Sequence, residues 1–125
     1  MNIHESAEDY LEAVLKLQQR SGMVRSIDVA NELGYSKPSV SIAMKKLRES
    51  GYLEFDPGGA IRLLPPGREI AERIYTRHRV LTHALICMGV DADVAAQDAC
   101  KIEHDMSDES FSCLQKYMQH LQEKP

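Results

Sequence analysis

Cys100, Glu103 and His104 have the side-chain types and the spacing of metal ligands. They stand at positions i, i+3 and i+4, which share one face of an α-helix. A thiolate, a carboxylate and an imidazole form a donor set for transition metals, because Ca²⁺ and Mg²⁺ prefer oxygen ligands alone. A buried cysteine, a surface glutamate and a capping histidine would give the same triplet, so the spacing alone leaves a structural role open.

Three residues elsewhere in the chain could extend this donor set. Asp9 and Glu12 form a second i, i+3 pair, and His78 lies between Arg77 and Arg79. The two carboxylates could equally stabilise the positive end of a helix, and His78 could belong to a solvated basic face. The sequence therefore predicts a metal site drawn from three segments, with these structural roles as the alternative.

Other chemistry at these residues is less well supported. Zinc hydrolases use mixed ligands with one open position, but nothing in the sequence supplies a substrate cleft or an independent general base, so we expect no enzymatic activity. The alternative function is a thiol-based redox regulator in which Cys100 reacts instead of binding metal. That function needs an exposed thiolate, which nearby carboxylates disfavour. Cys87 and Cys113 lie among apolar residues and are expected in the core, and three cysteines cannot form a complete disulfide set within the chain.

Hydrophobic periodicity predicts a mainly α-helical fold that would position these residues. Helices are expected over about 6–19, 26–33, 36–50, 68–87, 91–104 and 107–121, with Ser6, Ser36 and Ser107 as caps. Two short β-rich runs, at about 52–55 and 61–64, flank a Pro-Gly turn and predict a hairpin. The residues expected to line the helices' buried sides are Leu11, Val14, Leu15, Gln18, Ile27, Ala30, Leu33, Val40, Ala43, Met44, Leu47, Phe111, Leu114, Met118 and Leu121.

The segment 26–64 has the element order of a winged helix-turn-helix, with two short helices joined by Gly34-Tyr35-Ser36 and followed by the hairpin. The apolar side of the second helix would face inward. Its outer side would then offer lysines to phosphates, small hydroxyls to base edges and Ile42 to a thymine methyl group. A winged helix used for protein contacts is the alternative. The residues predicted to contact DNA are Arg25, Ser36, Lys37, Pro38, Ser39, Ser41, Ile42, Lys45, Lys46 and Arg62.

The distribution of charge supports DNA binding in spite of a net charge of −4. The segment 36–50 holds four Lys or Arg residues and one Glu, whereas 91–125 holds eight acidic residues and three Lys. One basic segment in an acidic protein fits a local footprint on DNA.

Length and composition indicate a small intracellular protein. A chain of 125 residues with 43% hydrophobic residues can form one domain or two small helical units, and a dimer interface would enlarge its core. No stretch approaches the roughly 18–20 apolar residues of a membrane helix, and the first residues do not read as a signal peptide. We therefore expect a cytoplasmic location and no membrane partner.

Several segments together resemble the iron-dependent repressor family, which includes the diphtheria toxin repressor and the manganese transport regulators. They are Glu8-Asp9-Tyr10-Leu11-Glu12, Ser36-Lys37-Pro38-Ser39-Val40-Ser41, Arg77-His78-Arg79 and the run from Cys100 to Ser107. The resemblance covers about 6–121. It implies a DNA-binding domain over 1–64, a helical metal-binding and dimerisation domain over 65–125, and a homodimeric repressor on operator DNA. It also implies a short form without the SH3-like domain of larger members.

The resemblance further implies which residues bind metal. Asp9, Glu12, His78, Cys100, Glu103 and His104 match the family's ligand positions, but the set is a hybrid of two types. The main iron type has Met at the position of Asp9, and the manganese regulators have Glu at the position of Cys100. Ala96 and Thr82 stand where an iron-type ancillary site has a histidine and a carboxylate. Because a thiolate disfavours Mn²⁺ relative to Fe²⁺, Co²⁺, Ni²⁺ or Zn²⁺, we expect Fe²⁺ in the cell and Mn²⁺ second.

Overall fold

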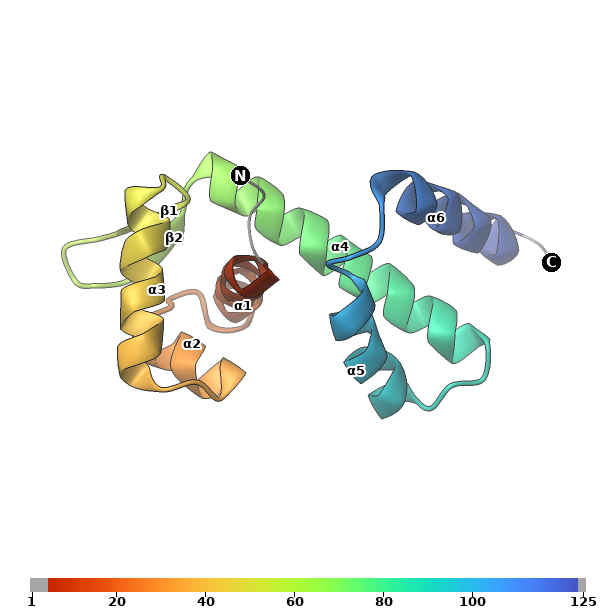
Figure 1. Cartoon of the computed structure of the whole chain (residues 1–125), viewed down its shortest axis with the longest axis horizontal. Helices are drawn as coiled ribbons and strands as arrows, with labels where there is room; N and C mark the ends of the chain where they lie inside the picture. Colours follow the sequence, from red (N-terminus) through yellow and green to blue (C-terminus); the bar gives the residue numbers. More distant parts are fainter. Residues whose placement is uncertain (1–4, 124–125) are drawn as a thin grey trace. The chain divides into compact units, whose positions relative to one another are not determined.

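The computed structural model describes residues 5–123, without the side chain of Glu123. Met1 to His4, on which the expectation of no signal peptide depends, and the last two residues of the predicted second domain lie outside this range. The helices are α1 (Glu5–Ser21), α2 (Ser26–Leu33), α3 (Lys37–Glu49), α4 (Pro65–Cys87), α5 (Ala92–Ile102) and α6 (Asp108–Glu123), and the strands are β1 (Leu53–Phe55) and β2 (Ile61–Leu63) (Figure 1). The mainly helical fold class is confirmed.

The chain divides into two compact units between Arg73 and Ile74, within α4. The predicted boundary at 64/65 lies at the start of that helix and stays a prediction.

The core of the first unit is built from the amphipathic faces of α1, α2 and α3. Leu11, Val14 and Leu15 of α1 and Val40 and Met44 of α3 are almost fully buried, as the periodicity predicts. Their i, i+3, i+4 spacing puts each set on one side of its helix.

The hairpin is antiparallel, with Glu54 opposite Arg62. It is attached to the helices by the amide of Ile61, which donates to the carbonyl of Val24 at 2.7 Å, and by Gln18 Nε2, which donates to the carbonyl of Ile61 at 3.2 Å. At its far end the amide of Leu64 donates to the carbonyl of Tyr52 at 3.0 Å, and α4 begins directly afterwards. Gly67 packs against that same carbonyl so closely that a Cβ atom would lie 2.0 Å from the oxygen.

The second unit contains the rest of α4 with α5 and α6. Its buried apolar side chains among the described residues are Ile74, Leu81 and Ala84 of α4, Ala95 and Ala99 of α5 and Met118 of α6. The side-chain carboxylate of Asp91 accepts from the amide of Asp93, so Asp91 caps α5.

Several local expectations are wrong. Ile27 is 38% exposed, and Val29 is buried in its place. Ile27 is spaced i, i+3 from Ala30 and Val29 is spaced i, i+4 from Leu33, so the pattern of a helix of only eight residues allows either one to face inward. Helix α1 already includes Glu5, so Ser6 is not its cap. Leu121 is 40% exposed on the isolated chain.

The expected core positions of two cysteines are also wrong, since Cys87 and Cys113 are exposed. Cys87 is the last residue of α4, next to the turn at Gly89, and Cys113 lies off the side of α6 that carries Phe111, Leu114 and Met118. Apolar neighbours in sequence therefore did not indicate burial at either position.

Candidate metal centre and DNA-reading helix

Three of the predicted ligands come together inside the second unit. Nδ1 of His78 in α4 lies 2.9 Å from Oε2 of Glu103 and 3.7 Å from Sγ of Cys100. One donor atom from each of the three residues lies within 4.8 Å of the other two. Glu103 is fully buried, His78 is half-buried and Cys100 is exposed, so the cluster has a closed side and an open side.

The turn after α5 departs from the expected continuous helix. The helix ends at Ile102, and the amides of Asp105 and Met106 both bond back to the carbonyl of Ile102. Glu103 keeps helical dihedrals and its amide still bonds to Ala99, so its relation to Cys100 is that of a helix. His104 lies in the turn itself.

Arg77, for which the sequence offered only a solvated basic face as an alternative, is 2% exposed and holds this turn. Its Nη1 donates to the carbonyl oxygens of Glu103 at 3.0 Å and Met106 at 2.5 Å, and its Nη2 pairs with Asp108 Oδ1 at 2.5 Å. The guanidinium also lies 5.2 Å from the ring centroid of Phe111. Arg77 therefore fixes the backbone that carries Glu103 and His104. Its acceptors lie 26 to 31 residues away, so no local pattern could have identified it.

The buried carboxylate of Glu103 fits a bound cation. Its Oε2 contacts His78, while its Oε1 lies 3.5 Å from His104 Nε2 and accepts no hydrogen bond within 5–123. Burying a carboxylate oxygen without a hydrogen bond is unfavourable, and a positive ion beside it removes that penalty. Sulfur, nitrogen and oxygen donors at these separations suit a divalent transition metal.

Asp9 and Glu12 lie on α1 in the first unit. Glu12 is 5% exposed, with Oε2 at 3.5 Å from Lys16 Nζ, and Asp9 is half-buried. Tyr10, next to Asp9, packs edge-on against Tyr35, and their ring centroids are 5.9 Å apart. Burial raises the pKa of Tyr10, and the nearby Tyr35 and Asp9 raise it further. That Asp9 and Glu12 join the ligands of the second unit stays a prediction.

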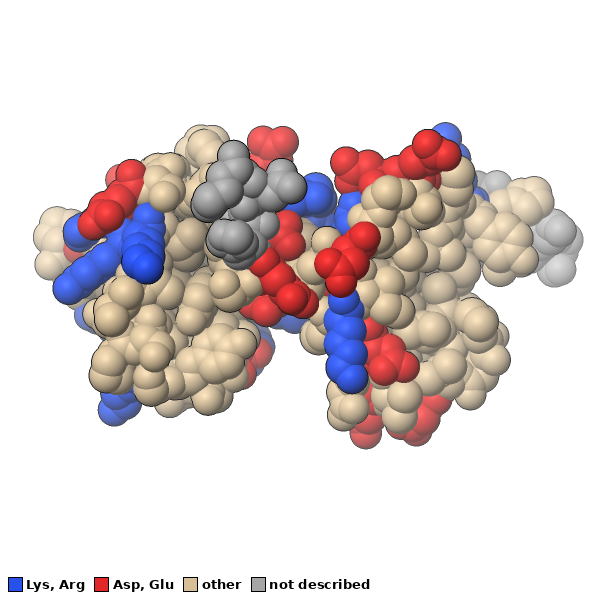
Figure 2. Space-filling view, in the orientation of Figure 1, with Lys and Arg blue, Asp and Glu red and all other residues tan. Residues whose placement is uncertain are grey.

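Helix α3 presents the expected outer side. Ser36 caps it by accepting from the amide of Ser39 at 3.3 Å, and its hydroxyl donates to that of Ser39 at 2.7 Å. Ile42 is 56% exposed, as expected for a residue that would reach a base. Lys37, Pro38, Ser39, Lys45 and Lys46 are exposed and Ser41 is half-buried. Lys and Arg side chains gather over α3 and the hairpin, whereas acidic side chains predominate on the visible face of the second unit (Figure 2).

The other two predicted DNA contacts have partners within the first unit. Arg25 donates through Nη1 to the carbonyl of Gly58 and so ties the start of α2 to the hairpin turn. Arg62 pairs with Glu54 across the hairpin at 3.0 Å, and both side chains are exposed. Exposed pairs of this kind contribute about 0–1 kcal/mol and are easily exchanged for a phosphate. Phosphate contacts by Arg25 and Arg62 stay predictions.

A winged helix-turn-helix, together with a helical unit that carries a metal donor set, defines the class of metal-dependent transcriptional regulators. A family model described as iron dependent repressor, N-terminal DNA binding domain, matches residues 2–61, and one described as iron dependent repressor, metal binding and dimerisation domain, matches residues 65–125. The chain belongs to the iron-dependent repressor family. It is a metal-dependent transcriptional repressor, and the family consists of regulators rather than enzymes, as expected. The two domains support operator DNA and a second copy of the chain as its partners.

Individual relatives agree with this assignment. The transcriptional regulator MntR of Salmonella typhimurium is 30% identical over 115 residues, which cover 92% of this chain and 73% of the relative. An uncharacterised HTH-type transcriptional regulator of Methanocaldococcus jannaschii is 31% identical over 122 residues, covering 96% and 98%.

Among solved structures, the manganese regulator SloR matches with a TM-score of 0.80 and 27% identity over 95% of this chain. A manganese-dependent transcriptional repressor in complex with manganese matches with a TM-score of 0.83 and 28% identity over 90%. The chain covers only 55% and 52% of these two structures, about half their length. Within residues 5–123, no helix is long and apolar enough to cross a membrane.

Proposed function

We propose that this protein represses transcription as a cytoplasmic homodimer whose operator binding is switched on by Fe²⁺, with Mn²⁺ as the second choice. The observation that carries the proposal is the convergence of His78, Cys100 and Glu103 within the second unit. Because the bound metal would control repression, the protein would regulate genes of metal homeostasis according to the metal concentration in the cell.

The proposed ligand set is the hybrid that the sequence indicates. His78, Cys100 and Glu103 supply nitrogen, sulfur and oxygen donors, and His104 follows directly in the turn held by Arg77. Asp9 and Glu12 of α1 are proposed as further ligands on the basis of the family resemblance. A bound divalent ion would supply positive charge and strong coordination bonds, which compensate the like charges of the carboxylates and the thiolate.

The thiolate of Cys100 decides the choice of metal. Two similar solved structures are named for manganese, but a soft sulfur donor favours Fe²⁺ over Mn²⁺ in the order of divalent affinities. The proposal therefore places Fe²⁺ first, against the names of these relatives.

In the proposed switch, carboxylates of α1 bind the same ion as the second unit and thereby restrain the DNA-binding unit. In a two-fold dimer this restraint sets the two copies of α3 about 34–36 Å apart, one turn of DNA. A shift from mostly inactive to mostly active requires roughly 5 kcal/mol of differential metal affinity, which a site with several ligands can supply.

The experiment is a titration of operator binding with Fe²⁺, Mn²⁺ and Co²⁺ under anaerobic conditions, on a duplex selected from a random pool by the Fe²⁺-loaded protein. The proposal expects affinity to rise with metal, to fall with chelator, and to respond to less Fe²⁺ than Mn²⁺. Operator affinity that is unchanged after removal of all metal would overturn the switch and leave DNA binding standing.

The redox alternative has one supporting observation, because Cys100 is exposed and its sulfur lies 3.7 Å from a histidine nitrogen. The same experiment separates the two functions. Peroxide-sensitive operator binding by protein kept strictly free of metal would favour the thiol switch over the metal switch.

A further inference from the structure

A second group of donor atoms lies further along α4, away from Cys100 and Glu103. His83 and Cys87 stand at i and i+4, so both side chains leave the same face of the helix. Nε2 of His83 lies 3.6 Å from Sγ of Cys87 and 3.2 Å from Nε2 of Gln122, which comes from α6. We call these three residues the His83 cluster.

The separation of the sulfur and nitrogen atoms matches that of two ligands on one ion. Zinc binds sulfur at about 2.3 Å and imidazole nitrogen at about 2.0–2.1 Å, and a tetrahedral angle between these bonds puts the two donors about 3.6 Å apart. The same ring nitrogen contacts both neighbours, so in the tautomer protonated at Nδ1 its lone pair is directed toward them and available to an ion.

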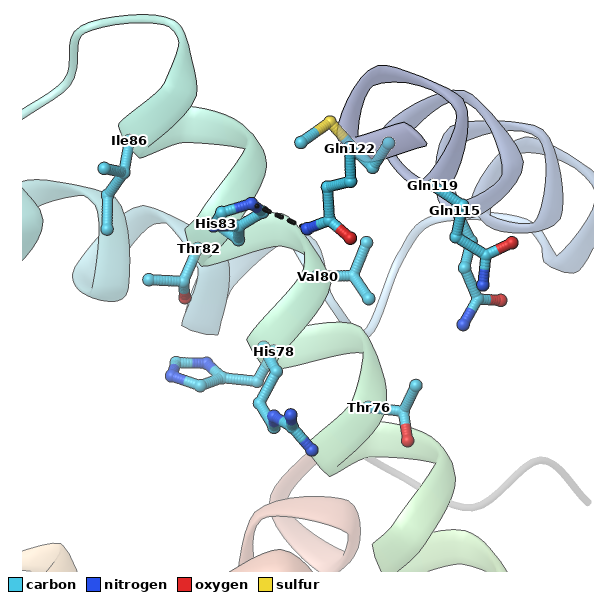
Figure 3. Close-up of a pocket in the computed structure, with 11 residues that line it drawn as sticks. Thr76, His78, Val80, Thr82, His83, Ile86, Gln115, Gln119 and Gln122 are labelled. Atoms are coloured by element: carbon cyan, nitrogen blue, oxygen red, sulfur yellow. Dashed lines mark hydrogen bonds between the residues drawn. The ribbon is translucent and has the colours of Figure 1, made fainter. Parts of the chain in front are cut away.

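The surroundings of the cluster leave room for an ion and a further ligand. His83 and Gln122 line a groove of about 660 Å³ between α4 and α6, and Figure 3 shows their side chains reaching toward each other across it. Rotation of the Gln122 amide by half a turn would present its carbonyl oxygen to the ion instead of its nitrogen. Water can occupy the fourth position, because His83 and Cys87 are both exposed.

We propose that His83 and Cys87, aided by Gln122, form a second binding site for Zn²⁺ or a metal of similar softness, separate from the Cys100 centre. Binding releases the thiol proton of Cys87 to solvent, so a neutral imidazole and a thiolate face the ion. Since the ligands come from α4 and α6, the ion cross-links the two helices of the second unit.

The test uses anaerobic Co²⁺ as the probe, because sulfur bound to Co²⁺ gives a charge-transfer absorption band. The Cys100→Ser variant removes the thiolate of the first centre, so any remaining band reports another cysteine. The proposal expects this variant to keep a band of one sulfur per chain, and Zn²⁺ to abolish the band by displacing Co²⁺.

Two double variants and one matched control identify the site. Adding Cys87→Ser should remove the band, and adding His83→Gln should raise the Co²⁺ concentration for half-saturation by about tenfold or more. Adding Cys113→Ser, which removes the other exposed cysteine, should change nothing. Absence of the band in Cys100→Ser, or its survival in the Cys87→Ser double variant, would overturn the proposal. Operator binding enters none of these measurements, so the metal switch can fail while this site stands, or the reverse.

Discussion

Arg77 donates a hydrogen bond through Nη1 to the carbonyl oxygen of Glu103 at 3.0 Å, next to the carboxylate that faces His78. Arg77, the residue before His78 in α4, thus fixes the backbone of Glu103, the other member of this donor pair. The arrangement makes the geometry of the donor set depend on a residue that binds no metal.

Replacing Arg77 should weaken metal binding, although Arg77 is not itself a candidate ligand. In Arg77→Met the carbonyls of Glu103 and Met106 lose their donor, which we expect to lower the free energy of unfolding by about 2–4 kcal/mol. The looser turn should reduce metal affinity roughly tenfold to hundredfold. Denaturant unfolding and calorimetric titration with Co²⁺ measure the two effects.

Arg79→Met is the matched control for this prediction. Arg79 is exposed and lies over the ring of Tyr75 at 5.7 Å, so its loss should change either quantity little. Arg77→Lys should give values of stability and metal affinity between those of the two methionine variants, because one ammonium group cannot reproduce the planar fork of a guanidinium. Equal metal affinity in Arg77→Met and Arg79→Met would show that the turn needs no such support.

The second prediction concerns the choice between iron and manganese. Cys100→Ser replaces a soft donor by a hard one, so the advantage of Fe²⁺ over Mn²⁺ in activating operator binding should shrink by roughly tenfold or more. Titrations of wild type and variant with each metal measure this ratio, and Cys113→Ser is the control with an exposed cysteine elsewhere. A ratio that does not change in Cys100→Ser would mean that sulfur is not a ligand.

The sequence predicted most of the fold because the helices carry regular apolar patterns and clear end signals. Ser36 caps its helix as expected, and Val40, Met44 and Leu47 form the buried side of α3. Where a helix is short, as in α2, the pattern could not decide between two neighbouring faces.

The candidate site was only partly predictable for a different reason. The spacing of Cys100 and Glu103 left a structural role open, and it was the family resemblance that predicted His78 of another helix in the same ligand set. The role of Arg77 depends on contacts with residues far along the chain, and a positive charge on a helix ordinarily indicates solvent. Local sequence also misled at Cys87. Its apolar neighbours suggested burial, but they belong to an exposed helix end.

A third prediction tests the DNA-reading helix through the salt dependence of binding. If Lys45 and Lys46 contact phosphates, each change to Ala should reduce the slope of log affinity against log salt by about 1. Lys101→Ala removes an exposed lysine of the second unit and should leave the slope unchanged. Fluorescence anisotropy over a range of salt concentrations gives the slopes, and identical slopes in all three variants would contradict phosphate contacts from α3.

Ile42→Ala should act differently from the lysine variants. Because Ile42 is exposed on α3, its loss should not destabilise the fold by more than about 0.5 kcal/mol. If its side chain packs on a thymine methyl group, operator affinity should fall by about 1–3 kcal/mol while non-specific binding stays constant. Comparison of affinities for operator and scrambled duplexes measures this difference. An equal loss of affinity on both duplexes would rule out a contact between Ile42 and a base.

The last prediction concerns the junction between the hairpin and α4. A Cβ atom on Gly67 would lie 2.0 Å from the carbonyl oxygen of Tyr52, and the nearest atoms are backbone, so they cannot rotate away. Gly67→Ala should therefore lower the free energy of unfolding by about 1–3 kcal/mol, the usual effect of overpacking. Gly58→Ala is the control, since its Cβ would meet only side-chain atoms at 3.4 Å or more. Thermal and denaturant unfolding compare the two, and a Gly67→Ala protein as stable as Gly58→Ala would mean that the start of α4 can move off the hairpin without cost.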